Sequence, residues 1–583
     1  MNSKITVAAL AVIALAISVS VPVSPPAERS YIVQGASLDS ATRAVLAVDG
    51  NITHELGVIR AVAADLTKAQ LDELSAGDHS LRIFENGSIE TAGKPPKNDG
   101  GDIGDSDSTD GGTTDPSTDT FYTTLINGDV VHQMGIDGSG IGIAVLDTGL
   151  WKHAGIKNDA AGNLRIKAVY NAITDSIATS VLSGDDPAGH GSHVASIAVS
   201  SLMTADATAR YNGVAPGAHL VSVQAFDENG NGTYADVVRA IDWVVTNRKK
   251  HKIRIINASF SAEPRSYYWD DPINQAIMVA WQNEIFVVAA AGNRGPDPMT
   301  IGVPGNVPYV LTVGAMTDNF TAADAADDEL ASFSSTGPTV EGFVKPEVVA
   351  PGGHMRGLVQ NNSVLANAYP QYYDGQYFEM SGTSQATAVV SGIAALVLQA
   401  EPWRSVDELK CKIMSAAKPA SYRDRGKDVP AYSVFQQGAG RVDAYAAVMN
   451  QTVGCANNGL HIDNDIDGLQ HFGGPANQET DGTYFLRGEL DSRQTGYVWD
   501  GSYVDSSGYL WTDGGTVWTD GYLWTEGYLW TDGVGVDGYL WTDGGGVWTD
   551  GYLWTEGYLW TDGGVWTDAL TEMTSISTWV PQE

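Results

Sequence analysis

The chain has 583 residues, more than one ordinary domain contains, so roughly two to four units are expected. Its formal net charge is −37, from 33 Lys and Arg against 70 Asp and Glu. Such an acidic surface repels phosphate backbones and anionic lipids, which excludes nucleic acid as an expected partner and argues against membrane binding through a basic patch. The two cysteines are too few for a disulfide scaffold or a zinc site.

The first 24 residues have the composition of a secretory signal. Lys4 precedes an apolar run from Ile5 to Val21, and Pro22 and small residues follow that run. An uncleaved membrane anchor is the alternative, because the run approaches the length of a membrane span. The pattern favours export, so we expect residues 1–24 to be a signal peptide and the protein to be secreted and extracellular.

Residues 30–92 have the pattern of a small α+β unit. Apolar runs and capping residues predict a strand, a helix, a strand, a helix and a strand, at 31–35, 37–50, 54–66, 67–76 and 79–87. Residues 93–120 then consist largely of Gly, Pro, Ser, Thr and Asp. Such a segment buries almost nothing, so we expect a flexible acidic linker that proteases cut easily.

From residue 121 to 449, apolar runs alternate with helical patterns. Runs typical of strands buried on both faces occur at 140–147, 219–226, 254–260, 285–292 and 309–316, and helical patterns occur at 233–249 and 272–284. This alternation predicts a mostly parallel central sheet with helices on both faces, which is a three-layer α/β fold.

Three short motifs in this region contain an Asp, a His and a Ser, the residue types that act together in nucleophilic catalysis by serine. "VLDTGL" places Asp147 at the end of a predicted strand, "GHGSHVASIA" places His190 at a helix start, and "MSGTSQATAVV" places Ser384 at another helix start. Each phrase alone is weak: Asp-Thr-Gly also marks aspartic peptidases, which need two copies, and a lone buried His or a capping Ser is more often structural. Together, in the order Asp, His, Ser, they match one of the chain orders of the serine triad.

The region 121–449 resembles the subtilisin family of serine peptidases, and the likeness continues between the three phrases. "VVAAAGNRGPD" resembles the family's oxyanion segment, "NASFSAE" and "ENGNGTYADVVRAIDWV" resemble its two substrate-pairing edges, and "ASFSSTGPTVEGFVKPEVVAPG" resembles the AprX-like bacterial branch. The resemblance implies a subtilisin-like fold and a serine endopeptidase of protein or peptide substrates, with no cofactor required for the chemistry. We expect a monomer.

The resemblance also implies roles for individual residues. His190 would be the general base for Ser384, and Asp147 would orient His190. Asn293 would stabilise the oxyanion together with the Ser384 N–H. The implied substrate-binding residues are Tyr234, Ala235 and Asp236 on one edge, Ser259, Phe260 and Ser261 on the other, Ala289, Ala290, Ala291 and Gly292 on the walls of the P1 pocket, and Gly302 at its base.

Specificity is expected to follow from this pocket, which holds P1, the residue whose carbonyl is attacked. A glycine base leaves room, so the resemblance implies a large apolar P1 residue such as Leu, Phe, Tyr or Met. Arg294 stands at the rim, where it would accept an acidic P1 residue or be a solvated surface arginine. The Val303–Pro304 bond resembles a family position with a cis peptide. Ser261 and Ala262 replace edge-strand glycines, and the Ser261 change affects how tightly a substrate backbone docks.

Other departures from the family pattern leave every reacting group in place. Ser192 stands for the commoner Thr, Gln385 for Met and Ala388 for Pro. The helix after His190 lacks an obvious oxygen-rich insertion of the kind that forms the family's strong calcium loop. Acidic loops elsewhere still offer oxygen ligands for Ca²⁺, so structural calcium is left open and no metal ligands are assigned.

The resemblance suggests that residues 30–92 are a pro-domain, a small inhibitor that assists folding and is then cleaved; an unrelated accessory domain is the alternative. Cys411 follows the nucleophile helix and Cys455 lies just past the domain, so a bridge between them would pin the domain end. Such a bridge would stabilise the domain by about 3–4 kcal/mol if it were unstrained.

The C-terminal part is divided into a Gly/Asp-rich connector at 450–507, repeats of the phrase YLWTDG at 508–568 and an end at 569–583. Six is an even number, so an extended hexad keeps Tyr, Trp and the acid on one face, and short stacked strands are expected. Three uses compete: a self-packed or partly disordered extension, binding of a polysaccharide or a surface through Trp and Tyr, and repetitive calcium binding.

These observations predict a secreted serine endopeptidase that is made as a precursor. The alternative is a non-catalytic surface protein that binds peptides or glycans through the Trp-rich tail. Intact Asp147, His190, Ser384 and Asn293 argue against that alternative.

Overall fold

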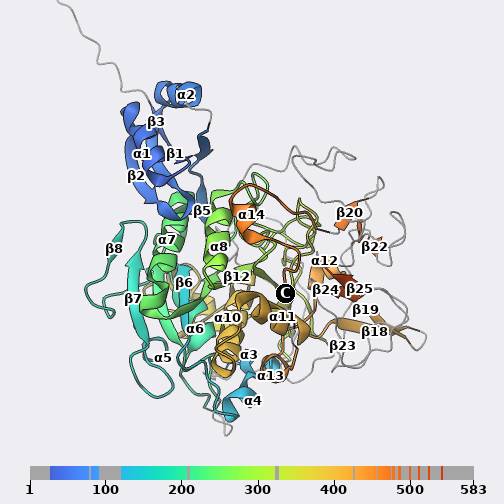
Figure 1. The fold of residues 1–583 in the computed structure, drawn as a ribbon. Coiled ribbons are helices and arrows are strands. Elements are labelled where there is room, and N and C mark those ends of the chain that lie inside the picture. The colour runs from blue at the N-terminus through green and yellow to red at the C-terminus, as the bar shows by residue number, and fades with distance from the viewer. Residues whose placement is uncertain are drawn as a thin grey trace, which may run out of the picture.

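The computed structural model describes residues 27–77, 80–90, 120–205, 210–321, 327–424, 427–452, 454 and 456–474, together with short strands between 476 and 542. These residues form a small N-terminal unit that lies against a larger α/β domain (Figure 1). The expected signal, the linker up to residue 119, Cys455, most of the repeats and the end at 569–583 lie outside the described residues.

The N-terminal unit is a four-stranded antiparallel sheet covered by two helices. The strand order is β2-β3-β1-β4. Its elements are β1 (Glu28–Gln34), α1 (Leu38–Ala47), β2 (Asn51–Leu56), η1 (Gly57–Ile59), β3 (Ala61–Thr67), α2 (Lys68–Gly77) and β4 (Arg82–Glu85). One strand was expected over 54–66, and this expectation is wrong: η1 and the left-handed Arg60 (φ 60°) reverse the chain, so β2 and β3 pair antiparallel.

The larger domain is built on a nine-stranded sheet, and the strands of its central part are parallel. The order is β14-β13-β12-β11-β6-β9-β7-β8, with β15 also paired to β13. The strands are β6 (Gly142–Asp147), β7 (Ile166–Asn171), β8 (Ser176–Ile177), β9 (His219–Gln224), β11 (Ile253–Ala258), β12 (Phe286–Ala290), β13 (Leu311–Thr317), β14 (Glu329–Leu330) and β15 (Val348–Pro351). Only the short strands β8 and β14 pair antiparallel within this described sheet. Each of the five apolar runs identified in the sequence overlaps one of these strands, within one residue at either end of the strand.

Helices cover both faces of the sheet, which confirms the predicted three-layer α/β fold (Figure 1). The helices α7 (Tyr234–His251) and α8 (Pro272–Gln282) pack together on one face, and α6 (His190–Val199) and α10 (Thr383–Ala400) pack together on the other. A Thr233–Asp236 capping box begins α7, and Asp271 caps α8. Of the described helices, α10 alone has the length and apolar composition of a membrane span, and 89% of that window is buried inside the domain.

The other described elements are short. The helices are α3 (Tyr122–Leu125), α4 (Gly128–Gln133), α5 (Ala154–Lys157), α9 (Val364–Ala368), η2 (Pro370–Tyr372), α11 (Val406–Ser415), α12 (Val434–Gln437) and α13 (Ala444–Met449). The strands outside the main sheet are β5 (Ser88–Glu90), β10 (Asn231–Thr233), β16 (Met355–Leu358), β17 (Tyr377–Met380), β18 (Ala420–Asp424) and β19 (Lys427–Pro430).

The packed domain continues beyond its expected end at Met449. The short helix α14 (Ile462–Ile466) lies against α8. Its buried Asp465 accepts hydrogen bonds from the hydroxyls of Tyr268 (2.6 Å) and Tyr309 (3.1 Å). Farther on, the N–H of Ala476 donates to the carbonyl oxygen of Gly342 at 2.9 Å. The expected boundary is therefore too early, because Gly and Asp in this stretch form turns and buried contacts with the domain.

Short strands recur after this point, at β20 (Ala476–Gln478), β21 (Tyr484–Leu486), β22 (Val498–Trp499), β23 (Leu510–Trp511), β24 (Leu523–Thr525) and β25 (Leu540–Thr542). The strand β23 pairs antiparallel with β18, and β24 pairs parallel with β25. The use of the repeats stays a prediction.

Glu341 is a buried carboxyl that should make the domain less stable at alkaline pH. Its Oε1 accepts the Tyr268 N–H at 2.8 Å, but burial raises the pKa of Glu341 to about 7, and the negative charge of Asp465 adds to this effect. Because the folded-state pKa is above the unfolded value, stability is full at low pH and falls as pH rises from about 4.5 to about 7. We expect Glu341→Gln, in a Ser384→Ala background, to raise Tm more at pH 8 than at pH 5. Equal shifts at the two pH values would contradict this prediction.

Candidate active site

The centre of the site is a contact between a strand end and a helix start. Asp147 is the last residue of β6, and His190 is the first residue of α6. Nδ1 of His190 lies 2.6 Å from Oδ1 of Asp147, and both side chains are almost completely buried. The same Oδ1 accepts the Thr148 N–H at 2.8 Å. A carboxylate at Nδ1 holds the proton on that nitrogen, which leaves Nε2 as the atom that can accept a proton.

A second buried carboxylate, Asp186, holds the first turn of α6 in place. Its Oδ1 accepts from the Gly189 N–H (3.0 Å) and the Thr148 hydroxyl (2.7 Å), and its Oδ2 accepts from the N–H (2.7 Å) and hydroxyl (2.6 Å) of Ser192. Burial raises the pKa of Asp186, although these bonds oppose the effect. Sequence reasoning missed this residue; its position four residues before His190 in "DDPAGH" was the available signal.

His193 lies next to the site, and its side chain contacts main-chain carbonyl oxygens and not the reacting groups. Its Nε2 lies 3.1 Å from the Met355 carbonyl oxygen and 3.0 Å from that of Phe378. Burial, with repulsion from His190, lowers the pKa of His193 to about 3, so this ring is neutral at physiological pH. Gln385 lies 3.4 Å from its Nδ1, which gives this departure from the family pattern a structural role.

Ser384 is the second residue of α10, and Asn293 is hydrogen-bonded to Thr383, the first. The Ser384 hydroxyl donates to the Ser259 carbonyl oxygen at 3.1 Å. Oδ1 of Asn293 accepts both the N–H (3.0 Å) and the hydroxyl (2.9 Å) of Thr383, the residue before Ser384. Nδ2 of Asn293 is buried and has no hydrogen-bond acceptor among the described residues. The amide is therefore held by its oxygen and has a donor available for an anion beside Ser384.

The remaining predicted site residues lie around this centre. Ser259 to Ala262 follow β11. Ala289 and Ala290 end the neighbouring parallel strand β12, and Ala291 and Gly292 follow it. The Gly302 N–H donates to the Ala291 carbonyl oxygen at 3.0 Å, so that Gly302 closes the space between the two segments. The peptide bond Val303–Pro304 is cis, as expected. Arg294, expected at the pocket rim, forms an ion pair with Glu263 at 2.8 Å.

Tyr234, Ala235 and Asp236, which were expected on the other substrate edge, lie in a helix and not in a strand, and their substrate role stays a prediction. They form the first turn of α7, and the strand before them is β10, at Asn231–Thr233. The strand β5 of the N-terminal unit pairs antiparallel with β10, with Ser88 opposite Thr233 and Ile89 opposite Gly232.

The N-terminal unit also contacts α7 and α8, which lie beneath it in Figure 1. The Ala235 N–H donates to Oδ1 of Asn86 at 2.9 Å, and Nε2 of His54 lies 3.1 Å from Oδ1 of Asp236. Nε2 of Gln34 donates to Oε1 of Gln275 at 2.6 Å. Polar side chains thus connect the two parts around the paired strands.

Other predicted features remain untested. Cys411 is buried, and Cys455 lies outside the described residues, so their bridge stays a prediction. In the part of the chain that the structure describes, no group of three or more His, Cys, Asp or Glu is placed to hold a metal ion.

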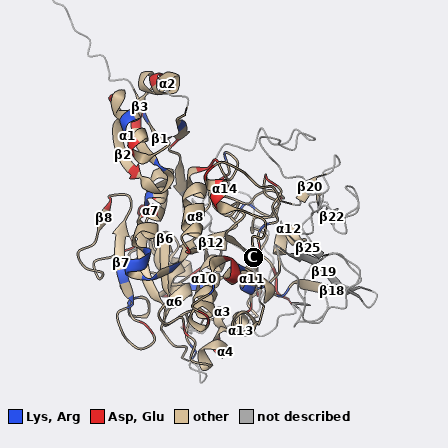
Figure 2. Cartoon of the chain, in the orientation of Figure 1, with Lys and Arg blue, Asp and Glu red and all other residues tan. Residues whose placement is uncertain are grey.

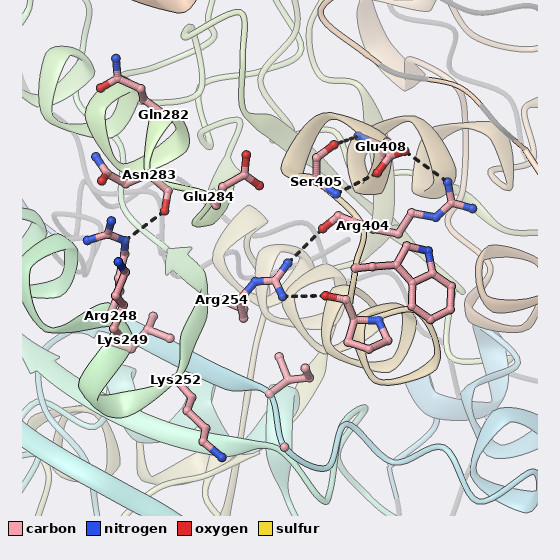
Figure 3. Close-up of a pocket in the computed structure, with 15 residues that line it drawn as sticks. Arg248, Lys249, Lys252, Arg254, Gln282, Asn283, Glu284, Arg404, Ser405 and Glu408 are labelled. Carbon is pink, nitrogen blue, oxygen red and sulfur yellow. Dashed lines mark hydrogen bonds and ion pairs between the residues drawn. The ribbon is translucent and has the colours of Figure 1, made fainter.

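A groove of about 890 Å³ lies where strands β6 and β11 begin, at the other end of these strands from Asp147 (Figure 3). It is lined by Gly140 and Ile141 before β6, by the start of β11, and by basic side chains that include Arg248, Lys249 and Lys252 at the end of α7. The basic residues are blue in Figure 2. No predicted site residue lines this groove, so it is separate from the Asp147–His190 centre.

Comparison with known proteins agrees with this geometry. The subtilase family profile matches residues 138–440, a range that contains Asp147, His190 and Ser384. Serine protease AprX of Bacillus subtilis (strain 168) is 36% identical over 322 residues, which are 54% of this chain and 68% of that protein. Subtilisin DY of Bacillus licheniformis is 31% identical over 299 residues, which are 50% of this chain and 89% of that protein. Fervidolysin of Fervidobacterium pennivorans shares the fold, with a TM-score of 0.54 at 22% identity, over 74% of this chain and 62% of that chain.

Removing the Asp186 carboxylate should destabilise the domain. We expect Asp186→Ala to lower the free energy of unfolding by about 3 kcal/mol, because four buried hydrogen bonds lose their acceptor. Denaturant unfolding in a Ser384→Ala background measures the effect. Asp185→Ala is the matched control, because this neighbouring side chain is exposed. Equal stabilities of the two variants would contradict the role assigned to Asp186.

Proposed function

The chain belongs to the subtilase family of serine endopeptidases, and from this we propose that it hydrolyses peptide bonds of extracellular proteins with Ser384 as nucleophile, His190 as general base and Asp147 as the residue that orients His190. The observation that carries the proposal is the buried 2.6 Å contact between Asp147 and His190, at the edge of the sheet where α10 begins and bears Ser384 in its first turn. The anchored amide of Asn293 supports it.

The reaction would proceed in two halves. The Ser384 hydroxyl oxygen attacks the substrate carbonyl carbon while His190 Nε2 takes the hydroxyl proton, and the carbonyl oxygen becomes an anion. Nδ2 of Asn293 and the N–H of Ser384 stabilise that anion. The tetrahedral intermediate collapses, the C–N bond breaks, and His190 gives the proton to the leaving amine. Water then repeats the sequence on the acyl-enzyme, which releases the acid and regenerates Ser384.

Loss of the oxyanion donor should slow this chemistry with little effect on substrate binding. We expect Asn293→Ala to lower kcat by about 10²–10³-fold with a small change in KM, because the donor acts on charge that develops in the transition state. Thr383→Val should lower kcat less, since it removes one of the two contacts that hold Oδ1 of Asn293 and leaves Nδ2 in place.

A fluorophosphonate label tests the nucleophile directly. We expect the label on Ser384 in protein collected from culture medium, and no label in Ser384→Ala. Folded and fully processed protein that takes no label would refute the endopeptidase function and favour the alternative of a surface binding protein. Absence of the protein from the medium would refute the secretion that residues 1–24 predict.

We also propose that the N-terminal unit is an inhibitory pro-domain. Its strand β5 pairs with the short strand β10 through the main chain, as an extended peptide substrate would. Ile89 of β5 is completely buried, in contact with the core of the α/β domain. The contacts of Asn86, His54 and Gln34 orient the unit on α7 and α8.

Weaker docking of β5 should shorten the inhibited period. We expect Ile89→Ala to lower the docking free energy by about 2–4 kcal/mol and to reduce the delay between cleavage of the precursor, followed by immunoblot, and the appearance of activity. Leu46→Ala is the matched control, because Leu46 lies on the exposed surface of α1. An identical delay in the two variants would contradict the inhibitory role.

A further inference from the structure

The space for the P1 side chain can be located from the positions of the reacting groups. A substrate carbonyl that is attacked by Ser384 and stabilised by Nδ2 of Asn293 must lie at the start of α10. We call the space between residues 259–262, which follow β11, and residues 289–292, at and just after the end of the neighbouring strand β12, the crevice. Residue 302 forms its third side. The next residue, Val303, fixes this position, because its carbonyl oxygen accepts the Ala262 N–H at 2.9 Å and its N–H donates to the Ala262 carbonyl oxygen at 2.8 Å.

The side chain of Ser261 takes up the room that Gly302 leaves in this crevice. A Cβ built on Gly302 would lie 1.7 Å from the Ser261 hydroxyl oxygen, far inside any allowed contact distance. A Cβ built on Gly292, on the facing wall, would lie 3.3 Å from the same oxygen. Ser261 itself is only 3% exposed. Its hydroxyl oxygen therefore lies between the two glycines whose lack of side chains would otherwise make the crevice deep.

The lining near Gly292 is polar for a second reason. The Ser335 hydroxyl oxygen lies 2.8 Å from where a Cβ of Gly292 would be, and it accepts the Arg294 N–H at 3.1 Å. The Arg294 guanidinium is already paired with Glu263, so the rim does not present a free cation to a substrate carboxylate. A long apolar P1 side chain would thus meet hydroxyl groups without gaining a complementary partner.

We propose that Ser261 is a specificity-determining residue that restricts P1 to short side chains, such as Ala, Ser and Thr. This inference rests on the proposed endopeptidase function. It replaces the large apolar P1 residue that was expected from the glycine at position 302. One added group in a close-packed pocket typically changes discrimination by about 10–200-fold, which is enough for one hydroxymethyl group to set the preference.

The test uses the secreted, processed protein and peptides that differ only at P1, with Ala, Ser, Leu or Phe. Active enzyme is counted by fluorophosphonate labelling of Ser384, so that kcat/KM refers to competent sites. We expect the wild-type protein to cleave the Ala and Ser peptides with a higher kcat/KM than the Leu and Phe peptides. Ser261→Gly should raise the Phe-to-Ala ratio of kcat/KM by about tenfold or more.

Two further variants test whether the change in P1 preference comes from the size of the side chain at position 261. Ser261→Ala keeps Cβ and removes only the hydroxyl, so it should shift the ratio in the same direction by a smaller factor, and it remains informative if Ser261→Gly folds poorly. Ser266→Gly makes the same exchange outside the crevice and should leave the ratio unchanged.

The outcomes separate this inference from the function on which it rests. A wild-type protein that is labelled at Ser384 and prefers the Phe or Leu peptide would overturn the role of Ser261 and leave the endopeptidase function standing. An unchanged ratio in both Ser261 variants would do the same. Absence of both labelling and cleavage would overturn the proposed function, and this inference with it.

Discussion

The buried hydrogen bond between Asp147 and His190 is the contact around which the site is organised. It forms because β6 is parallel to its neighbours, so that its carboxyl end lies at the edge of the sheet where α6 and α10 begin. Away from water, an ionised carboxylate needs donors, and the N–H of Thr148 and the imidazole provide them. The buried side chain of Asp186 also receives hydrogen bonds, from Gly189, Thr148 and Ser192. The geometry of the base is thus held by two buried acids.

The same parallel arrangement explains where a substrate would bind. Because β11 and β12 are neighbours, the segments that follow them lie side by side, and the short strand β10 pairs with the N-terminal unit. That unit adds β5 to β10 and rests on α7 and α8, which lie on the face of the sheet opposite α6 and α10. The N-terminal unit is thus attached to β10 by a main-chain pairing that any extended peptide can make.

Three residues from separate segments of the chain, Ser261, Gly292 and Gly302, lie close together in the structure. The hydroxyl oxygen of Ser261 lies within contact distance of the points where side chains on Gly292 and Gly302 would begin. Sequence reasoning assigned Gly302 and Ser261 to separate features, a pocket base and a backbone edge. Gly302 and Ser261 lie in contact because their neighbours Val303 and Ala262, about forty residues apart in the chain, are hydrogen-bonded to each other.

The sequence by itself determined the α/β class, the five central strands and the order of Asp147, His190 and Ser384, because buried strands and helix starts leave strong local patterns. It did not determine the chain reversal at Arg60, the end of the domain beyond Met449, the four-bond role of Asp186 or the position of the Ser261 hydroxyl. Each of these depends on contacts between residues that are distant in the chain or on a local backbone conformation that no residue pattern marks. Only the tertiary structure decided them, since burial and hydrogen-bond partners exist once the elements have packed.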